Sequence, residues 1–321
     1  MNKPIISVII PAYNAANTII RCIESIAKCN VANYEVIVVD DVSTDDTYKI
    51  VAEFIEKGNS FIRLYKNEIN LGPSLSRKKG IEFSKGQLLA FVDADDFVEP
   101  FFLDELYNSQ KESSADITVC DYYIVNTSGK RSIRKVVPEQ LTISKSESLL
   151  LPVDSFSICL IKKSLFSGVF FPNIRNGEDM AVIPQLLSKA EKVAFVSKPL
   201  YNYIYYTNSL SNAFSEVKID SLVESFDVIN RAIGKEYPEE VEFLGIRNLL
   251  YGSMLAIFKF STDRVLAKKI LEKFSEKYPN WINSKYIHKL PWYKRIVIHN
   301  AQKRYWRRLR ILSLIHTFLC K

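Results

Sequence analysis

Three aspartates crowd the short segment Asp93-Ala94-Asp95-Asp96, directly after an apolar run at 87–92. Such a run is typical of a buried strand, and ligands of open α/β sheets bind just beyond the carboxyl ends of their strands. Carboxylates this close repel one another, and a bound divalent cation would relieve that repulsion. Their hard oxygen atoms favour Mg²⁺ or Mn²⁺, which typically joins one or two carboxylates to substrate phosphates. Asp95 or Asp96 could equally cap a helix beginning near Glu99-Pro100, and the segment alone does not decide between the two.

Strand and helix patterns alternate through the first half of the chain. Strand patterns occur at 5–10, 35–39, 61–65 and 88–92. Helix patterns separate them: one at 16–28, one that Ser43 or Thr44 caps, and one at 73–84. This order predicts an α/β fold, with a mostly parallel sheet flanked by helices on both faces. Parallel strands end at one edge, so Pro11-Ala12-Tyr13-Asn14, Asp40-Asp41 and the aspartate segment can converge on one ligand.

A fourth element, Asn70 to Gly80, places a turn at Gly72 before a helix. The helix N-terminus and the Arg77-Lys78 pair could serve phosphate oxygens. The glycine could also be only a turn, and the basic residues only a solvated face. The dinucleotide fingerprint G-x-G-x-x-G and the P-loop pattern are absent, which argues against a dehydrogenase and an NTPase.

The pattern changes in the second half. Strand patterns occupy 117–125, 156–161 and 193–196, with a polar turn region at 126–134 and irregular structure continuing to Pro152. Gly177-Glu178-Asp179 opens a helix pattern that runs to Ala190, and 215–278 is helical throughout. We therefore predict a catalytic domain at 1–214, a helical extension at 215–290 and a basic amphipathic helix at 291–321.

Positive charge is concentrated in the tail. The chain has 321 residues and a net charge of +7, but 277–321 holds eleven Lys or Arg and no Asp or Glu. Five cysteines without a C-x-x-C pair indicate neither a disulfide framework nor a thiolate zinc site. We find no signal peptide and no run of about 18 apolar residues, so we expect a cytoplasmic protein without a spanning helix.

The motifs together resemble glycosyltransferase family 2, whose members are inverting enzymes that use nucleotide sugars and have the GT-A fold. The matching segments occur in the family's order over roughly the first 210 residues. They are Pro11-Ala12-Tyr13-Asn14, Asp40-Asp41-Val42-Ser43, Asn70 to Gly80, Asp93-Ala94-Asp95, Glu178-Asp179 and Ser209-Leu210-Ser211.

The resemblance implies a role for each matching residue. Asp41 would contact the nucleobase, uracil in many members, and Pro11, Ala12 and Tyr13 would line the nucleoside pocket. Asp93 would lie near the ribose and donor sugar, beside Ala94, and Asp95 would bind the metal on the diphosphate. Asp179 would be the general base, and Glu178 would support it or contact the acceptor. The donor site would also include Asn70, Gly72 and Arg77.

These roles agree with the chemistry of the reaction. A nucleoside diphosphate leaves readily once a divalent ion neutralises its charge, and a carboxylate on the opposite face must then take the proton of the attacking hydroxyl. Asp179 could alternatively be only a helix N-cap beside Gly177.

The sequence departs from the family at two points. Val42 stands where members usually have a glycine, which predicts a turn that is not left-handed at that residue. Ser76-Arg77-Lys78 replaces the usual Ala-Arg-Asn, and we expect this change to tune donor contacts.

On a helical wheel the tail is amphipathic. Ile298, Ala301 and Leu309 fall on one side and Lys303, Arg307 and Arg310 on the other, a pattern typical of interfacial membrane helices. We expect contact with the inner leaflet, where a lipid-linked acceptor would reside, and no nucleic-acid partner. Packing of the tail on the catalytic domain is the alternative.

We therefore expect a metal-dependent inverting enzyme that transfers a hexose from a nucleoside diphosphate sugar during bacterial surface-polysaccharide assembly. A nucleotide-sugar pyrophosphorylase is a second candidate, but it would normally carry a Gly-rich basic loop after the first strand. A non-catalytic carbohydrate-binding protein is a third, and the intact Asp93, Asp95 and Asp179 argue against it.

Overall fold

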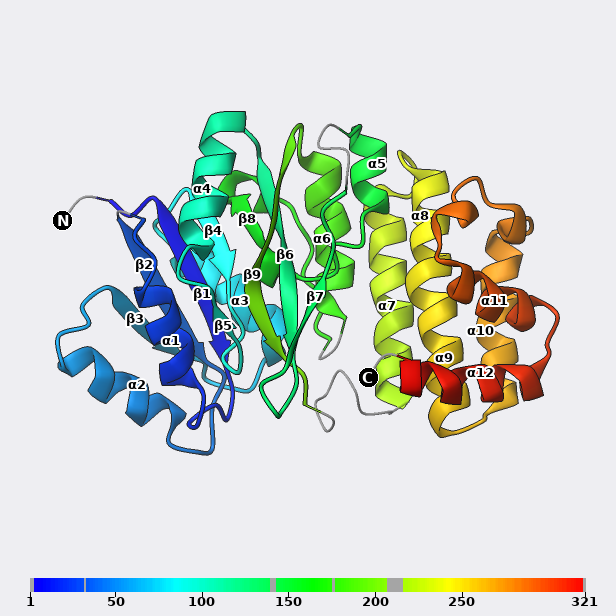
Figure 1. The fold of residues 1–321 in the computed structure, drawn as a ribbon, viewed down its shortest axis with the longest axis horizontal. Coiled ribbons are helices and arrows are strands. Elements are labelled where there is room, and N and C mark those ends of the chain that lie inside the picture. The colour runs from blue at the N-terminus through cyan, green and yellow to red at the C-terminus, as the bar shows by residue number, and fades with distance from the viewer. Residues whose placement is uncertain (1–2, 32, 139–142, 175–176, 207–215, 320–321) are drawn as a thin grey trace. The chain divides into compact units, whose positions relative to one another are not determined.

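The computed structural model describes residues 3–31, 33–138, 143–174, 177–206 and 216–319 (Figure 1). The chain forms two compact units, Met1–Ser209 and Leu210–Lys321. The expected boundary at 214/215 and the Ser209-Leu210-Ser211 segment lie outside the described residues.

One sheet organises the first unit. Its strands are β1 (Ile6–Ala12), β2 (Tyr34–Asp40), β3 (Ile62–Lys66), β4 (Leu88–Phe91), β5 (Phe97–Val98), β6 (Ile117–Val125), β7 (Arg131–Arg134), β8 (Cys159–Lys162) and β9 (Val193–Ile204). They pair in the order β3-β2-β1-β4-β8-β6-β9-β5, with β7 on β6. β1, β2, β3, β4, β6 and β9 run in one direction and β5, β7 and β8 oppose them. The predicted α/β fold with a mostly parallel sheet is confirmed among the described strands.

Six helices accompany the sheet in the described part of this unit: α1 (Ile19–Ala27), α2 (Thr47–Glu56), α3 (Gly72–Phe83), α4 (Phe102–Ser113), α5 (Lys145–Leu150) and α6 (Glu178–Lys189). α1 and α3 lie on opposite faces of the β1–β2–β4 strands (Figure 1). α3 lies very close to β1, because a Cβ at Gly80 would overlap the Ile9 side chain. The strands between these layers are almost wholly apolar and buried, as a two-sided sheet requires.

Three local predictions were wrong. β7 falls in the expected turn region, and α5 falls in the expected irregular segment, where Ser144 and Glu147 form a capping box. α2 is preceded by Asp46 rather than capped by Ser43 or Thr44. Those two residues instead contact Asn14: its backbone N–H donates to the Ser43 hydroxyl, and its side-chain oxygen accepts from Thr44.

The second unit is helical, as predicted for 215–278. It contains α7 (Glu216–Ile233), α8 (Pro238–Leu244), a π-helical turn at Gly245–Leu250, α9 (Tyr251–Phe260), α10 (Arg264–Lys277), α11 (Trp292–Gln302) and α12 (Trp306–Leu319). Among the described residues, one continuous helix, Pro238–Phe260, is long and apolar enough to cross a membrane. Because 72% of its most apolar window is buried, it also meets the description of a core helix.

The tail forms two helices rather than the single helix expected at 291–321. α11 ends at Gln302 and α12 begins at Trp306, and between them Arg304 adopts a left-handed φ of 55°. The predicted apolar positions Ile298, Ala301 and Leu309 are buried, and Arg310 donates to the carbonyl oxygens of Phe258 and Lys259 at the end of α9.

Candidate active site

The buried Arg77 joins the aspartate segment after β4 to the first residues of α6, which lie far apart in the sequence. Arg77, on α3, is 4% exposed. Its Nη2 lies 2.6 Å from Asp93 Oδ1, and its Nη1 lies 2.6 Å from Glu178 Oε1 and 3.6 Å from Asp179 Oδ1. The guanidinium carbon also lies over the Phe156 ring, 5.7 Å from its centroid. We call these four charged residues the Arg77 cluster.

The cluster holds one positive charge against three carboxylates. Burial alone would lower the pKa of Arg77, but Asp93, Asp179 and Glu178 outweigh it and hold that pKa well above its usual value. The guanidinium was expected at the donor phosphates, whereas here it is bound to carboxylates. A phosphate contact by Arg77 stays a prediction.

Asp179 is the least satisfied member of the cluster. Its Oδ2 accepts from the Phe156 backbone N–H at 3.2 Å, while its Oδ1 is buried without a hydrogen-bond partner among the described residues. Burial raises the pKa of Asp179 to about 7; Arg77 opposes that rise and Glu178 and Asp93 add to it. The alternative role as an N-cap is wrong, because Gly177 occupies that position and Asp179 lies within α6.

The aspartate segment divides its three carboxylates between different roles. Asp96 is buried, accepts from Tyr201 Oη at 2.6 Å and accepts from the Ile204 backbone N–H at 2.7 Å. Asp93 belongs to the Arg77 cluster, and Asp95 is exposed. The helix-cap interpretation of Asp95 and Asp96 is wrong, because α4 begins at Phe102 without a side-chain cap.

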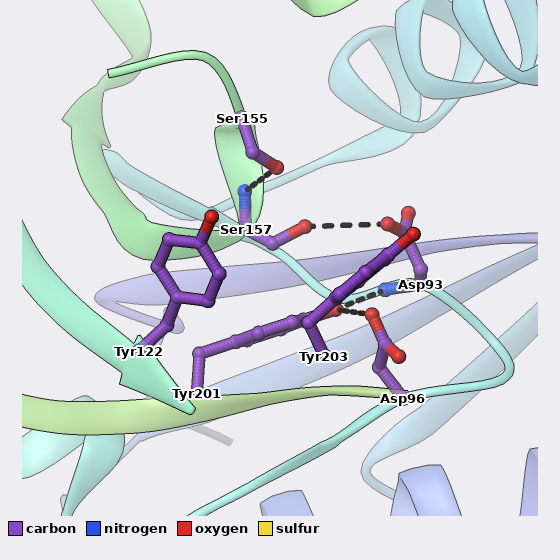
Figure 2. Close-up of a pocket in the computed structure, with 7 residues that line it drawn as sticks. All are labelled: Asp93, Asp96, Tyr122, Ser155, Ser157, Tyr201 and Tyr203. Carbon is purple, nitrogen blue, oxygen red and sulfur yellow. Dashed lines mark hydrogen bonds between the residues drawn. The ribbon is translucent and has the colours of Figure 1, made fainter. Parts of the chain in front are cut away.

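A small cavity of about 90 Å³ lies beside Asp93. Figure 2 shows Ser157 reaching toward the Asp93 carboxylate and Tyr201 between Asp93 and Asp96. Aromatic and hydroxyl side chains form its walls, a lining suited to a sugar ring with its apolar face and its hydroxyl edge. The lining residues are Asp93, Asp96, Tyr122, Ser155, Ser157, Tyr201 and Tyr203.

Asp95 and Asp93 fit the expected divalent cation. Although Asp95 is exposed as a residue, the protein atoms around its carboxylate remove part of its hydration and, together with repulsion from Asp93, raise its pKa to about 6, so added positive charge would stabilise its ionised form. Among the described residues no group of three His, Cys, Asp or Glu side chains could hold a metal by itself. Binding of Mg²⁺ or Mn²⁺ by Asp95 and Asp93 therefore stays a prediction, in which substrate phosphates would complete the coordination.

Asp41, which was expected at the nucleobase, is 3% exposed and accepts hydrogen bonds from the backbone at the start of α3. Its carboxylate accepts from Asn67 Nδ2 at 2.7 Å and from the backbone N–H groups of Leu71 and Gly72 at 2.8 and 2.7 Å. Asn70 Nδ2 donates to the Asp41 carbonyl oxygen at 3.0 Å. A base contact by Asp41 stays a prediction, and it would require a shift of these donors.

The turn after Asp41 contradicts one expectation. Val42 has a φ of 62°, so the position that usually holds glycine is left-handed here as well. Hydrogen bonds on both sides impose this conformation: Asn70 holds the Asp41 carbonyl, and the Ser43 N–H donates to Asp40 Oδ2 at 3.2 Å. A β-branched residue is strained in this region.

The remaining predicted donor residues lie at the same edge of the sheet. Pro11 and Ala12 end β1, and Tyr13 follows them with 52% of its surface exposed. Ala94 is buried within the aspartate segment, and Gly72 begins α3 with a φ of 78°. The structure does not bring Asp41 into the Arg77 cluster, so the expected gathering of acids is seen directly only for Asp93, Glu178 and Asp179.

Sequence reasoning missed Phe156, Ser157 and Tyr201. Phe156 and Ser157 lie in a 3-10 turn, Phe156–Ile158, before β8, and Tyr201 lies inside the long strand β9. No motif surrounds them, and their closeness to Asp93 depends on how β8 and β9 pair in the sheet. The only available signal was a run of hydroxyl and aromatic residues at 155–157.

Comparison with known proteins agrees with this geometry. Residues 7–170 match the sequence model of glycosyl transferase family 2. The chain is 30% identical over 214 residues to glycosyltransferase GlyG of Streptococcus pneumoniae serotype 4, covering 62% of this chain and 70% of that protein. It is 27% identical over 297 residues to the poly(ribitol-phosphate) beta-glucosyltransferase of Bacillus spizizenii, covering 89% of this chain and 45% of that protein.

The chain spans less than half the length of that glucosyltransferase and of GlyA of S. pneumoniae, of which it covers 38%. Among solved structures, S. aureus TarS 1–349 in complex with UDP-GlcNAc superposes with a TM-score of 0.66 at 21% identity, covering 97% of this chain and 91% of that one. That likeness shows a shared GT-A type of fold. With half of its length matched by the family's own sequence model, this chain is a member of glycosyltransferase family 2.

Proposed function

We propose that this glycosyltransferase moves a hexose, with inversion, from a UDP-sugar to a saccharide or lipid-linked saccharide acceptor in surface-polysaccharide synthesis. The names of two relatives, a poly(ribitol-phosphate) beta-glucosyltransferase and a putative teichuronic acid biosynthesis glycosyltransferase, support the acceptor class. A UDP-GlcNAc complex of the similar fold supports the donor. The observation that carries the proposal is the buried Asp179 Oδ1, which accepts no hydrogen bond among the described residues and lies 3.6 Å from Arg77 Nη1, so that it can take a proton.

Asp179 has the properties of the general base. A base works best when its pKa is near the working pH, and burial brings the pKa of Asp179 to about 7. The acceptor hydroxyl gives its proton to Asp179 as its oxygen bonds to the anomeric carbon. The bond from that carbon to the diphosphate breaks, and its electron pair leaves with UDP. Attack from the opposite face converts an α-linked donor into a β-linked product.

Arg77 has a positioning role in this scheme. It holds Asp93 and Glu178 with two short ion pairs and leaves Asp179 at the longer distance of 3.6 Å. Because the guanidinium is planar and buried, its fork fixes the three carboxylates relative to one another. Asp93 is thereby placed at the cavity wall, and Asp179 keeps one oxygen available.

We further propose that Asp95 and Asp93 hold Mg²⁺ or Mn²⁺ with the donor. A divalent ion bound there would neutralise charge on the diphosphate as it leaves. The support is the oxygen-only donor set and the raised pKa of Asp95.

The test is a donor panel. UDP-glucose, UDP-galactose, UDP-GlcNAc, GDP-mannose and dTDP-glucose are incubated with the protein and Mn²⁺, and released nucleoside diphosphate is measured. Release of UDP from one UDP-sugar, abolished by EDTA and restored by Mn²⁺, is the expected result. Formation of UTP on addition of pyrophosphate would identify a pyrophosphorylase, and binding without release would identify a non-catalytic protein.

We also propose that the protein attaches peripherally to the inner face of the cell membrane through α12. Three aliphatic side chains on this helix are between 42% and 57% exposed, and Arg307 and Arg308 are exposed on the same helix. Exposed apolar residues beside basic ones suit an anionic bilayer surface. The aliphatic residues are Ile311, Leu314 and Ile315.

Flotation with anionic vesicles tests the attachment. Replacing Ile311 and Ile315 by Asn should lower recovery with the vesicles, whereas the same change at Ile69 and Val265, which are 68% and 79% exposed on other elements, should not. Equal recovery of both variants and the wild type would refute membrane contact by α12.

A further inference from the structure

The hairpin formed by β6 and β7 carries a basic segment that the proposed reaction does not use. Residues 130–135 read Lys-Arg-Ser-Ile-Arg-Lys, and all six are exposed. No acidic residue occurs between 126 and 137. We call Lys130, Arg131, Arg134 and Lys135 the basic hairpin.

The hairpin is held in place at both ends of β7. At the turn, Asn126 Oδ1 accepts from the backbone N–H groups of Ser128 and Lys130 at 3.1 and 2.9 Å. After the strand, Asp121 Oδ1 accepts from the backbone N–H groups of Val136 and Val137 at 2.7 and 2.9 Å. The basic side chains therefore extend from a fixed backbone, which reduces the entropy lost on binding a ligand.

Arg134 connects the basic hairpin to the cavity beside Asp93. It lies directly opposite Tyr122 in the β6–β7 register, close enough for its positive charge to act on the Tyr122 hydroxyl. Tyr122 lines the cavity next to Ser155 and Ser157 (Figure 2). The guanidinium of Arg134 is therefore one side chain away from the space we assign to a sugar.

Arg131 is already engaged on the other face of the hairpin. Its Nη1 lies 2.8 Å from Glu99 Oε1, and its guanidinium lies over the rings of Phe97 and Tyr123. Lys130, Arg134 and Lys135 have no ion pair among the described residues. The negative charge of Asp154 also acts on the Tyr122 hydroxyl, but one carboxylate offsets only part of the positive charge of these three side chains.

We propose that the basic hairpin binds an acceptor chain that carries anions, phosphate or carboxylate groups, with Arg134 contacting the anion nearest the sugar that accepts. This inference rests on the proposed glycosyl transfer and specifies its acceptor. A guanidinium binds either anion through paired N–H donors, and lysines beside it add longer-range attraction. Because these side chains are exposed, salt should weaken the binding.

Binding is measured without donor, by fluorescence anisotropy, with three labelled probes of similar length: an oligo(ribitol phosphate), an oligogalacturonate and maltohexaose. The test variant is Arg134→Gln with Lys135→Gln. The matched control is Lys57→Gln with Lys111→Gln. It removes the same amount of positive charge from two exposed residues of the first unit that lie outside the hairpin.

We expect an anionic probe to bind the wild type and the control alike and the test variant about tenfold more weakly, the scale of losing charge-assisted contacts. The maltohexaose affinity should be unchanged by either pair of substitutions. The two anionic probes together show which anion the hairpin prefers.

Two outcomes would overturn the proposal: equal affinity of the anionic probes for the test variant and the wild type, or an equal loss in the control variant. UDP release by water in the absence of acceptor should remain unchanged in the test variant. If the wild type itself releases no UDP, that result counts against the proposed transfer reaction. The anion-binding measurement is then judged on its own.

Discussion

Two aspartates of the first unit, the buried Asp41 and the mostly buried Asp179, have opposite environments. The Asp41 carboxylate accepts three hydrogen bonds, from one side-chain amide and two backbone N–H groups. Asp179 accepts a hydrogen bond at one oxygen, whereas its other oxygen is buried with no hydrogen-bond donor among the described residues and only the longer ion pair to Arg77. The difference teaches that an acid at a strand or helix end serves structure when the backbone satisfies it, and is available for chemistry when the backbone leaves it unsatisfied.

The largest effect is expected from removing the base. Asp179→Asn should lower the transfer rate by about a thousandfold, the usual scale of general-base catalysis. The thermal shift produced by UDP and Mn²⁺ should persist, because the substitution leaves Asp93 and Asp95 intact. Retention of wild-type transfer by this variant would remove Asp179 from the reaction.

The next largest effect should follow the loss of Arg77. Arg77→Met leaves buried Glu178 and partly buried Asp179 and Asp93 without their cation, and removing one partner of a buried ion pair costs about 3–5 kcal/mol of stability. Urea unfolding measures this change, with Lys78→Met, an exposed position on the same helix, as the control. Equal midpoints for both variants would show that the cluster does not stabilise the fold.

Asp41→Asn should destabilise the protein, in contrast to Asp179→Asn. In Asp41→Asn, one of the two carboxylate oxygens becomes an NH₂ group, which cannot accept a hydrogen bond. Either the Gly72 N–H or the pair of donors from Asn67 and Leu71 then loses its acceptor, at a cost of about 2 kcal/mol. Urea unfolding of the two Asn variants side by side tests the comparison directly. It fails if Asp179→Asn is the more destabilising of the pair.

The pH dependence should separate the two aspartates further. Burial raises the pKa of Asp179 from 3.8 to about 7, so the folded protein keeps a proton that the unfolded chain has lost across this window. The unfolding free energy should therefore fall as pH rises from about 4 to 7, by about 1.4 kcal/mol per pH unit at most. The rate should instead rise through pH 7 as the base ionises. Both trends should be absent from Asp179→Asn, as judged by urea unfolding and kcat/KM between pH 5 and 9.

The smallest effect concerns the turn after Asp41. Val42 has a left-handed φ, which is strained for a β-branched residue. Val42→Gly removes this strain and should stabilise the protein by about 1 kcal/mol. Val42→Ala, which keeps a Cβ, should give little of this gain in thermal unfolding. A loss of stability in Val42→Gly would mean that packing of the valine side chain outweighs the strain.

Much of the fold could be predicted because its strands are local apolar patterns. β1, β2 and β6 contain buried β-branched residues, β4 is a short buried apolar run, and β6 has the predicted bounds. β7 could not be recognised, since an exposed edge strand reading Arg-Ser-Ile-Arg has no buried face to pattern. The capping box of α5 was present in the sequence as Ser144 and Glu147, but the helix behind it is short.

The candidate site could be predicted only in part. The acids could be placed at one sheet edge from strand order alone, but their partners could not. Whether Arg77 faces phosphate or carboxylates depends on how deeply α3 packs, and the φ of Val42 depends on a hydrogen bond from Asn70. These are tertiary contacts that a local pattern does not contain.

The missing side chain at Gly80 has a consequence for the whole reaction centre. Residues three apart on a helix share a face, so the position that touches Ile9 lies one turn from Arg77. A methyl group at residue 80 would push α3 away from β1 and carry the guanidinium outward with it. The position of the Arg77 guanidinium, and with it that of the carboxylates it holds, thus depends on residue 80 having no side chain where α3 meets β1.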